Sequence, residues 1–333
     1  MKMMKQYAAA ICAVATLMGG AAQAEVVARV GSVAPEGTPW AEWLKNVQKN
    51  VKTKSNGTLR LKVFLAGKLG GEKEMVEDVK RGRLQYFGGS AGALASKYVP
   101  ELNVLELPFL FSSDAEADYV LDKIRPDITK ILAERGFVFV MWAENGWHGY
   151  GVRGKCVTSP DDMVGLKMRS QESQIHLETY KAFGASPVEL PVPEVLSSLQ
   201  TGVVDGFSNT PLFAFATSWH KGVDHYSYTK HIYQPGLVVV SKDWFEGLSD
   251  DHKTIILDRT NEKDGIAGVR ALGEPLLENF TYAGVKVCRV SDEQRKVFET
   301  KAKPVWDQFA AKSKGNKAIL DKIIAAKKEF AAK

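Results

Sequence analysis

The chain has 333 residues, of which 44 are Lys or Arg and 39 are Asp or Glu, so its net charge is +5. This charge is mild for the length, and we expect no nucleic-acid partner, because such a partner requires a basic patch or stripe. The length predicts two lobes of ordinary domain size.

The N-terminus has the pattern of a secretory signal peptide over residues 1–24. Lys2 and Lys5 form a positive region, residues 7–18 form a short apolar run, and Ala22-Gln23-Ala24 is a small-residue cleavage site. The apolar run is shorter than the roughly 20 residues that span a bilayer, and no later run is long enough either. We therefore expect cleavage near Ala24 and an exported, soluble protein in the periplasm, with a net charge of +3 after the two lysines are removed.

The first part of the mature chain alternates strands with helices. The helix that starts at Thr38-Pro39 has an N-cap residue followed by a proline suited to the first helical position. A second helix has Met75, Val76 and Val79 on its inward face. This second helix is expected at residues 72–83, and a third at 114–135 with an interruption near Pro126. The expected strands are residues 26–30, 59–64, 86–92 and 137–142. This alternation predicts an α/β lobe with a mainly parallel sheet.

Glycine-punctuated residues 144–151 mark the first crossing between lobes, and a strand at 237–241 returns the chain to the first lobe. A long helical stretch at 249–282, a strand at 285–290 and two closing helices follow. We predict a bilobal α/β clamshell whose lobes are joined by hinge strands and a long helix. Lobe I comprises residues 25–146 and 235–275, and lobe II comprises residues 147–234 and 276–333.

The segment from Gly165 to Asn209 carries the candidate site. It reads as strand, helix, strand, helix, strand, with Arg169 at the tip of its first strand and Asn209 just beyond its last. In open α/β sheets, ligands bind outside the carboxyl ends of the strands. The planar fork of an arginine matches a carboxylate, and an asparagine offers both donors and an acceptor. The pair predicts a site for a small organic anion, although each residue alone also fits an exposed strand end or turn.

Sequence patterns of enzymes and metal sites are absent from the chain. It has no His-Glu-x-x-His helix, no Gly-x-Ser-x-Gly elbow and no Walker loop, and residues 88–92 do not fit the dinucleotide fingerprint. His220 and His225 are five apart, which favours surface histidines over metal ligands. We therefore expect a binding protein without enzymatic activity, cofactor or metal.

Five blocks of sequence occur in a specific order along the mature chain. They are Pro-Glu-Gly-Thr-Pro-Trp at 35–40, Leu-Pro-Phe-Leu-Phe at 107–111, Pro-Asp-Asp-Met-Val-Gly-Leu-Lys-Met-Arg at 160–169, Gly-Ala-Ser-Pro at 184–187 and Leu-Gln-Thr-Gly-Val-Val-Asp-Gly at 199–206. The chain thereby resembles the DctP-type solute-binding proteins of TRAP transporters. This resemblance implies the periplasmic-binding-protein fold. It also implies that the protein delivers a carboxylate-bearing solute to a membrane permease, which is driven by an ion gradient, usually of sodium. It also implies that Arg169 salt-bridges the carboxylate and that Asn209 is a site residue.

The chain departs from this family's pattern at several site positions. Relatives that bind sugar acids carry an arginine where His148 stands and polar residues where Gly89 and Gly92 stand, and the usual Asp-Gly-Gln-Glu-Asn is Asp-Gly-Phe-Ser-Asn here, with Phe207 in place of the glutamine. These departures predict a less polar pocket that is roomier near Gly89. The expected ligand is an aromatic or branched monocarboxylate, with a wall supplied by Trp147, Phe207, Phe213 and Trp219. His148 would make dicarboxylate binding improve as the pH falls from about 7.5 to 6.

Three alternatives remain open at this point. They are a binding protein of an ABC importer, a receptor-coupled sensor, and an exported enzyme that uses His148 and Glu172 as base and acid near Arg169. Cys156 and Cys288 either pair in the oxidising periplasm or stay separate buried thiols. We expect a monomer whose partners are a small organic acid and TRAP permease subunits. The predicted ligand-binding residues are Arg169, Asn209, His148, Trp147, Phe207, Glu172 and Gly89.

Overall fold

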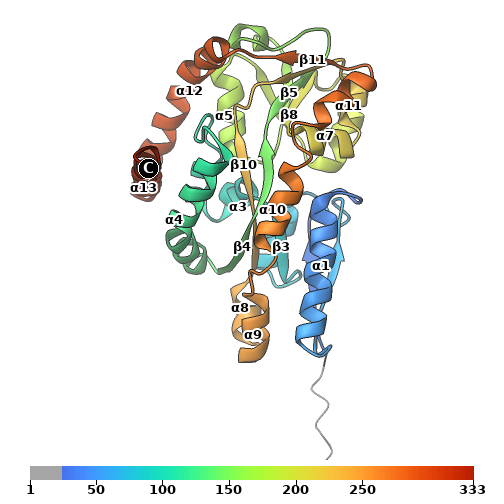
Figure 1. The fold of residues 1–333 in the computed structure, drawn as a ribbon, viewed down its shortest axis with the longest axis vertical. Coiled ribbons are helices and arrows are strands. Elements are labelled where there is room, and N and C mark those ends of the chain that lie inside the picture. Colours follow the sequence, from blue (N-terminus) through green and yellow to red (C-terminus); the bar gives the residue numbers. More distant parts are fainter. Residues whose placement is uncertain (1–24) are drawn as a thin grey trace, which may run out of the picture.

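The computed structural model describes residues 25–333, and its strands form two sheets joined in the middle of an elongated molecule (Figure 1). The first sheet has the order β2-β1-β3-β10-β4, with β1 (Val26–Gly31), β2 (Leu59–Phe64), β3 (Tyr86–Ser90), β4 (Phe137–Trp147) and β10 (Tyr233–Ser241). The second has the order β11-β9-β5-β8-β6-β7, with β5 (Gly149–Val152), β6 (Lys167–Ser170), β7 (Ser186–Glu189), β8 (Gly206–Asn209), β9 (His225–Tyr228) and β11 (Lys286–Arg289). We call each sheet with its helices the first and the second lobe. The expected α/β bilobal fold is confirmed.

Helices pack on both sheets. The first lobe carries α1 (Pro39–Lys54), α2 (Glu72–Lys80), α3 (Ala91–Lys97), α4 (Asp114–Glu134), α8 (Lys242–Glu246), α9 (Asp250–Ile256) and α10 (Glu262–Arg270), besides the 3-10 helix Pro100–Glu106. The second lobe carries α5 (Gln174–Ala182), α6 (Val195–Gln200), α7 (Pro211–Ala216), α11 (Leu276–Tyr282) and α12 (Asp292–Lys312) and the 3-10 helices Pro160–Met163, Val192–Glu194 and Trp219–Gly222. As predicted, Thr38 caps α1 by accepting from the backbone of Ala41, and Pro39 is the first helical residue. None of the helices in residues 25–333 is long and apolar enough to cross a membrane.

Two strands carry the chain between the lobes. β4 ends at Trp147 and continues after His148 as β5, while β10 starts directly after Ile232. The backbone N–H of His148 donates to the carbonyl of Ile232 over 2.8 Å, so the two crossing segments are bonded to each other. The predicted boundaries at 146/147 and 234/235 lie in these segments, and the exact division of the lobes stays a prediction.

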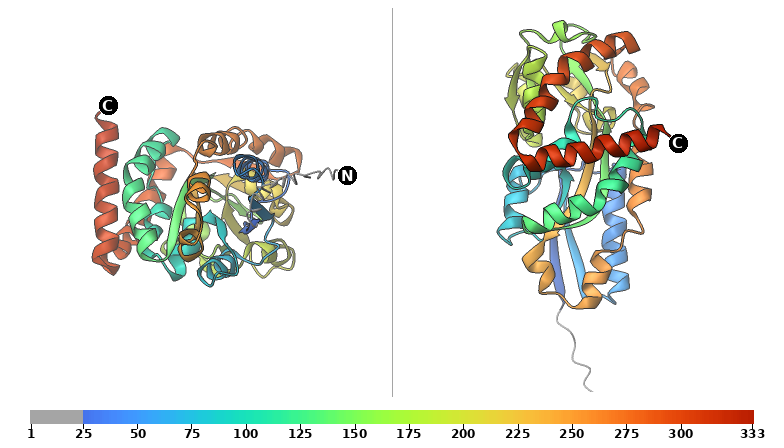
Figure 2. Two further views of the ribbon diagram at one scale, coloured as in Figure 1. Left: turned by 90° about the horizontal axis from the view of Figure 1, so that it is seen from below. Right: turned by 90° about the vertical axis from the view of Figure 1, so that its left-hand side faces the viewer.

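The C-terminal helix α13 (Lys314–Ala331) packs on α4 of the first lobe as well as on α12 of the second, although we expected residues 276–333 to belong to lobe II. Figure 2 shows α13 lying across the outside of the molecule beside α4. Tyr119 of α4 donates to Glu329 over 3.0 Å, and Asp127 of α4 pairs with Lys322. The chain end therefore crosses back over the lobe boundary.

Two helix predictions differ from the structure. The long helix expected at 249–282 is three helices, α9, α10 and α11. The first interruption lies between α9 and α10, where Asp258 accepts a hydrogen bond from the backbone N–H of Thr260. The second lies before α11, where Pro275 has no N–H to donate. Conversely, α4 runs through Pro126 without interruption, with Ile124 and Ile128 buried on either side of the proline. The burial of one residue before and one residue after the proline stabilises the continuous helix.

Cys156 and Cys288 form a disulfide with a Cα to Cα distance of 5.9 Å. The bond ties the loop that follows β5 to β11 at the edge of the second sheet. Of the two possibilities left open by the sequence, the structure therefore shows the paired one. The predicted signal peptide, residues 1–24, lies outside the described residues.

Candidate ligand-binding site

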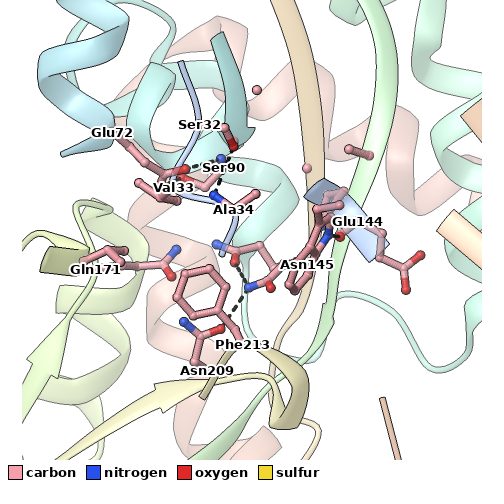
Figure 3. A pocket seen from close by; sticks show the side chains of 18 of the residues that line it. Ser32, Val33, Ala34, Glu72, Ser90, Glu144, Asn145, Gln171, Asn209 and Phe213 are labelled. Atoms are coloured by element: carbon pink, nitrogen blue, oxygen red, sulfur yellow. Dashed lines mark hydrogen bonds between the residues drawn. The ribbon is translucent and has the colours of Figure 1, made fainter. Parts of the chain in front are cut away.

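A cavity of about 80 Å³ lies between the lobes, against the strands that join them (Figure 3). Its lining has an apolar part and a polar part. The apolar side chains include Val33, Trp40, Trp43, Val192 and Phe213, and the polar ones include Glu72, Ser90, Asn145, Arg169, Gln171, Asn209 and Gln234. Both lobes and both joining strands thus contribute to the cavity wall.

Arg169 and Asn209 line this cavity from adjacent strands. β6 and β8 are parallel, with Arg169 opposite Phe207, so their carboxyl ends meet at the same sheet edge. Both side chains are almost fully buried, at 2% and 3% exposure. The sequence prediction that these two strand ends deliver neighbouring polar groups is consistent with this geometry.

The guanidinium of Arg169 is only partly satisfied by the protein. Its Nε donates to the carbonyl of Leu190 over 3.0 Å, and its Cζ lies 5.0 Å from the ring centroid of Trp219. Its Nη1 is buried without a hydrogen-bond partner among residues 25–333. Burial lowers the pKa of Arg169 to about 10, which still leaves it charged at neutral pH. A buried cationic donor without a partner is costly, and a carboxylate in the cavity would satisfy it.

Asn209 belongs to a chain of amides at the hinge. Its Oδ1 accepts from Asn145 Nδ2 over 2.9 Å, and the same nitrogen donates to Gln234 Oε1 over 2.7 Å. Figure 3 shows Asn145 and Asn209 facing each other at the cavity. Because the oxygen of Asn209 is occupied, its amide nitrogen is the group it can offer to a ligand.

Glu72 is a cavity residue that the sequence reasoning missed. Its Oε1 accepts from the backbone of Ser90 over 2.8 Å and its Oε2 from the Ser90 hydroxyl over 2.7 Å. Burial, with smaller contributions from the nearby Glu172 and Glu106, raises the pKa of Glu72 to about 7. A signal was present in the sequence, because Glu72 precedes the inward-facing Met75 and Val76 by three and four residues and shares their helix face.

The space beside the two glycines is occupied, so the expectation of a roomier pocket near Gly89 was wrong, while the expected lower polarity stays a prediction. A Cβ on Gly89 would lie 2.2 Å from Glu72 Oε1, and one on Gly92 would lie 2.4 Å from Glu106 Oε2. Each glycine therefore gives a buried carboxyl group room to approach the backbone. Glu72 and Glu106 thus bring carboxyl groups to the two positions where we expected relatives that bind sugar acids to carry polar side chains.

Glu106 holds two of the amides that line the cavity. Its Oε1 accepts from Gln234 Nε2 and from the backbone of Gly92, both over 2.9 Å, and Gln171 Nε2 lies 3.4 Å from its Oε2. Burial raises the pKa of Glu106, although these hydrogen bonds oppose the shift. Glu106 therefore fixes the side chains of Gln234 and Gln171 in the polar part of the cavity wall.

His148 lies behind the cavity wall, with no exposed surface. Its Nδ1 is 2.9 Å from Ser208 Oγ and its Nε2 is 3.2 Å from Gln234 Oε1. Burial, with His176 next in size, lowers the pKa of His148 well below its usual value. The lowered pKa favours the neutral ring, and it argues against the pH effect on dicarboxylates that we expected from His148.

Gly89 lines the cavity, as Arg169 and Asn209 do, whereas the predicted ligand-binding residues Trp147, Phe207 and Glu172 lie outside its lining. The indole of Trp147 donates to Asp114 Oδ1 over 2.6 Å, and Phe207 is buried against Trp219. The carboxylate of Glu172 accepts from the backbone of Glu72. Of the aromatic wall that we predicted, Phe213 lines the cavity and Trp219 lies beneath Arg169.

His220, which we expected at the surface, is buried. Its ring stacks on Phe215 with a centroid distance of 4.4 Å. Burial lowers the pKa of His220. Among residues 25–333, no three His, Cys, Asp or Glu side chains are grouped in a way that could hold a metal ion.

The raised pKa of Glu72 predicts a pH-dependent stability. Its pKa is about 7 in the folded protein against 4.5 for an unperturbed glutamate, so the folded state holds its proton more tightly. The resulting contribution is fully present below pH 4.5 and is lost as the pH rises through 7, with a total of up to about 3 kcal/mol. Urea unfolding from pH 5 to 8 should therefore show a steeper loss of stability in the wild type than in Glu72→Gln.

Glu144 provides the internal control for this measurement. Burial raises its pKa to about 7 as well, and it is present in both proteins. The difference between the two curves therefore isolates Glu72. Parallel curves for wild type and Glu72→Gln would contradict the assignment.

Comparison with known proteins shows the family of this chain. The family model described as bacterial extracellular solute-binding protein, family 7 (DctP) matches residues 30–313. A solute-binding protein of Verminephrobacter eiseniae is 31% identical over 249 residues, which are 71% of this chain and 74% of that protein.

Two solved structures share the fold. The sugar acid binding protein DctPAm of Advenella mimigardefordensis, in complex with galactonate, has a TM-score of 0.85 at 25% identity and covers 91% of this chain and 99% of its own. A TRAP periplasmic solute-binding protein of Citrobacter koseri, with bound D-glucuronate, has a TM-score of 0.83 at 27% identity and covers 90% and 98%. Since the family model matches most of its length, the chain belongs to the bacterial extracellular solute-binding protein family 7.

Proposed function

We propose that this protein captures one small organic carboxylate in the cavity between its lobes and delivers it to the membrane subunits of a TRAP transporter. The single observation that supports this most is the buried Nη1 of Arg169, which has no partner in residues 25–333 and matches one oxygen of a carboxylate. The solved relatives with galactonate and D-glucuronate hold ligands of the same chemical class. Genes for small and large permease subunits beside this one would separate the TRAP role from an ABC importer or a receptor-coupled sensor.

The two-sided wall indicates what else the solute carries. Val33, Trp40 and Phe213 offer an apolar face, while Glu72 and Gln171 offer hydrogen-bonding groups. Both groups already have partners in the chain, Glu72 at Ser90 and Gln171 at Glu106, so a polar substituent on the solute would add hydrogen bonds at about 0.5–1.5 kcal/mol each. A cavity that holds benzene measures about 150 Å³, so about 80 Å³ favours a small solute. We therefore favour a small hydroxylated carboxylate over the purely apolar acid that the sequence suggested.

Native mass spectrometry of freshly purified protein should detect one co-purified acid per chain. Calorimetry should then show tighter binding of lactate than of propionate, by about twofold to tenfold for one added hydrogen bond. Small-angle scattering at saturation should show a smaller radius of gyration, because a ligand that touches both lobes favours the closed state. An unchanged radius, or equal affinity for the two acids, would contradict the corresponding part of the proposal.

We further propose that the protein is exported, cleaved near Ala24, monomeric and without catalytic activity. Membership in an extracellular solute-binding family supports export. The alternative enzyme required His148 and Glu172 as base and acid, but His148 is buried and neutral, and neither residue lines the cavity. N-terminal sequencing of periplasmic protein and light scattering in solution test the cleavage site and the oligomeric state.

A further inference from the structure

The first turn of α2 touches the cavity and the opposite lobe at the same time. The side chain of Glu72 lines the cavity, whereas its backbone N–H donates to Glu172 Oε2 over 3.0 Å. Glu172 follows β6 in the second lobe, so this bond crosses the cleft. A Cβ added to Gly71 would lie 3.0 Å from both Glu172 Oε2 and Pro191 Cβ. The turn and the second lobe therefore meet in van der Waals contact.

The next residue makes a second bond across the cleft. Lys73 Nζ lies 2.5 Å from Glu189 Oε1 at the end of β7. Both side chains are partly exposed, at 24% and 36%, so this ion pair contributes little energy by itself. It fixes the same turn of α2 to a second point of the opposite sheet.

The bond to Glu172 differs in kind from the cap that α2 has within its own lobe. Glu74 Oε2 accepts from the backbone of Gly71 over 3.0 Å, and this bond does not depend on the second lobe. The N–H of Glu72 is bonded to the second lobe instead, and the first amides of a helix favour a negative charge. When the lobes separate, this hydrogen bond breaks, and both the amide of Glu72 and the carboxylate of Glu172 become exposed to water.

We propose that the first turn of α2, residues 71–74, is a latch that couples solute contact to lobe closure, with Glu172 as its main partner on the second lobe. This inference rests on the proposed function for the solute, but the latch itself consists of contacts within the chain. A solute that contacts the Glu72 side chain fixes the position of the first turn of α2. In that position, the backbone N–H of Glu72 donates to Glu172. Glu172 is therefore a positioning residue that acts on the closed state, not a residue that contacts the solute.

The latch makes a specific claim about affinity. If only the closed state binds tightly, the apparent dissociation constant rises in proportion to the loss of closed population. A hydrogen bond to a charged group corresponds to about a tenfold change in an equilibrium constant or more. Loss of Glu172 should thus lower the ratio of closed to open protein by about tenfold.

Cross-linking of the protein without solute tests this ratio. In the variant Lys73→Cys with Glu189→Cys, a short bifunctional methanethiosulfonate joins the two thiols only when the lobes meet, and the native cysteines are already bonded to each other. The trapping is irreversible, so its rate follows even a small closed population. Adding Glu172→Ala should slow it about tenfold, and Glu172→Gln, which keeps an acceptor oxygen, should slow it less.

Glu178→Ala serves as the matched control. The Glu178 carboxylate also belongs to the second lobe but bonds to Gln174 and Lys181 within α5. This variant should cross-link within twofold of the parent. Equal rates for Glu172→Ala and Glu178→Ala, or no cross-linking in the parent, would overturn the latch. Because the readout needs no solute, a protein that fails to bind acids but shows the tenfold effect would refute the proposed function alone.

Discussion

Arg169→Ala should weaken the binding of the co-purified acid roughly thirty-fold to several thousand-fold. Removing one partner of a buried, hydrogen-bonded charge pair costs about 2–5 kcal/mol. Arg169 is 2% exposed, and its Nη1 has no other partner in the part of the chain that the structure describes. Calorimetry of both proteins with the same acid measures the effect.

Arg169→Lys distinguishes the shape of the guanidinium from its charge. An ammonium is a point charge that cannot reproduce a planar fork, so this variant should also bind weakly. Arg289 in the same lobe is exposed, and Arg289→Ala should bind like the wild type. Affinity of Arg169→Lys within about twofold of wild type would show that binding needs only the positive charge and not the shape of the guanidinium.

Loss of the disulfide should cause the largest fall in stability. Cys156 and Cys288 are 132 residues apart, and in the chain-entropy model a loop of this size corresponds to about 5 kcal/mol. For a protein of this length, we expect the melting temperature of the Cys156→Ala, Cys288→Ala variant to fall by roughly 10 °C. Thermal unfolding followed by circular dichroism measures this difference.

Solute binding provides the control for the disulfide variant. Neither cysteine lines the cavity, so affinity at 25 °C should stay within about twofold of wild type. Reduction of the wild-type protein should reproduce the loss of stability. Equal melting temperatures for the oxidised protein and the double variant would show that the bond does not constrain the unfolded chain.

The positions of Arg169 and Asn209 follow from local sequence. Arg169 is the next-to-last residue of β6 and Asn209 is the last residue of β8, and the strand-helix alternation places the carboxyl ends of these two strands at one sheet edge. The N-cap at Thr38 was equally readable, because it depends on residues three positions away. The ordered sequence blocks added the family, which the match over residues 30–313 confirms.

The character of the cavity was decided by contacts between distant segments. Gly89 looked like open space in the sequence, but the carboxyl group of Glu72, 17 positions earlier, fills that space in the fold. His148 looked like a titrating replacement for an arginine, but burial behind Gln234 keeps it neutral. A residue's local sequence does not contain its burial, and burial sets both the pKa and the available volume.

The sequence by itself therefore determined the alternation of strands and helices, the family and the placement of Arg169 and Asn209 at neighbouring strand ends, since these depend on periodicity and on residues close together in the chain. Only the tertiary structure decided that Cys156 pairs with Cys288 and that Glu172 reaches across the cleft to α2. Both contacts join segments 100 or more residues apart. Such contacts depend on how the two lobes pack, and packing is a property of the whole chain.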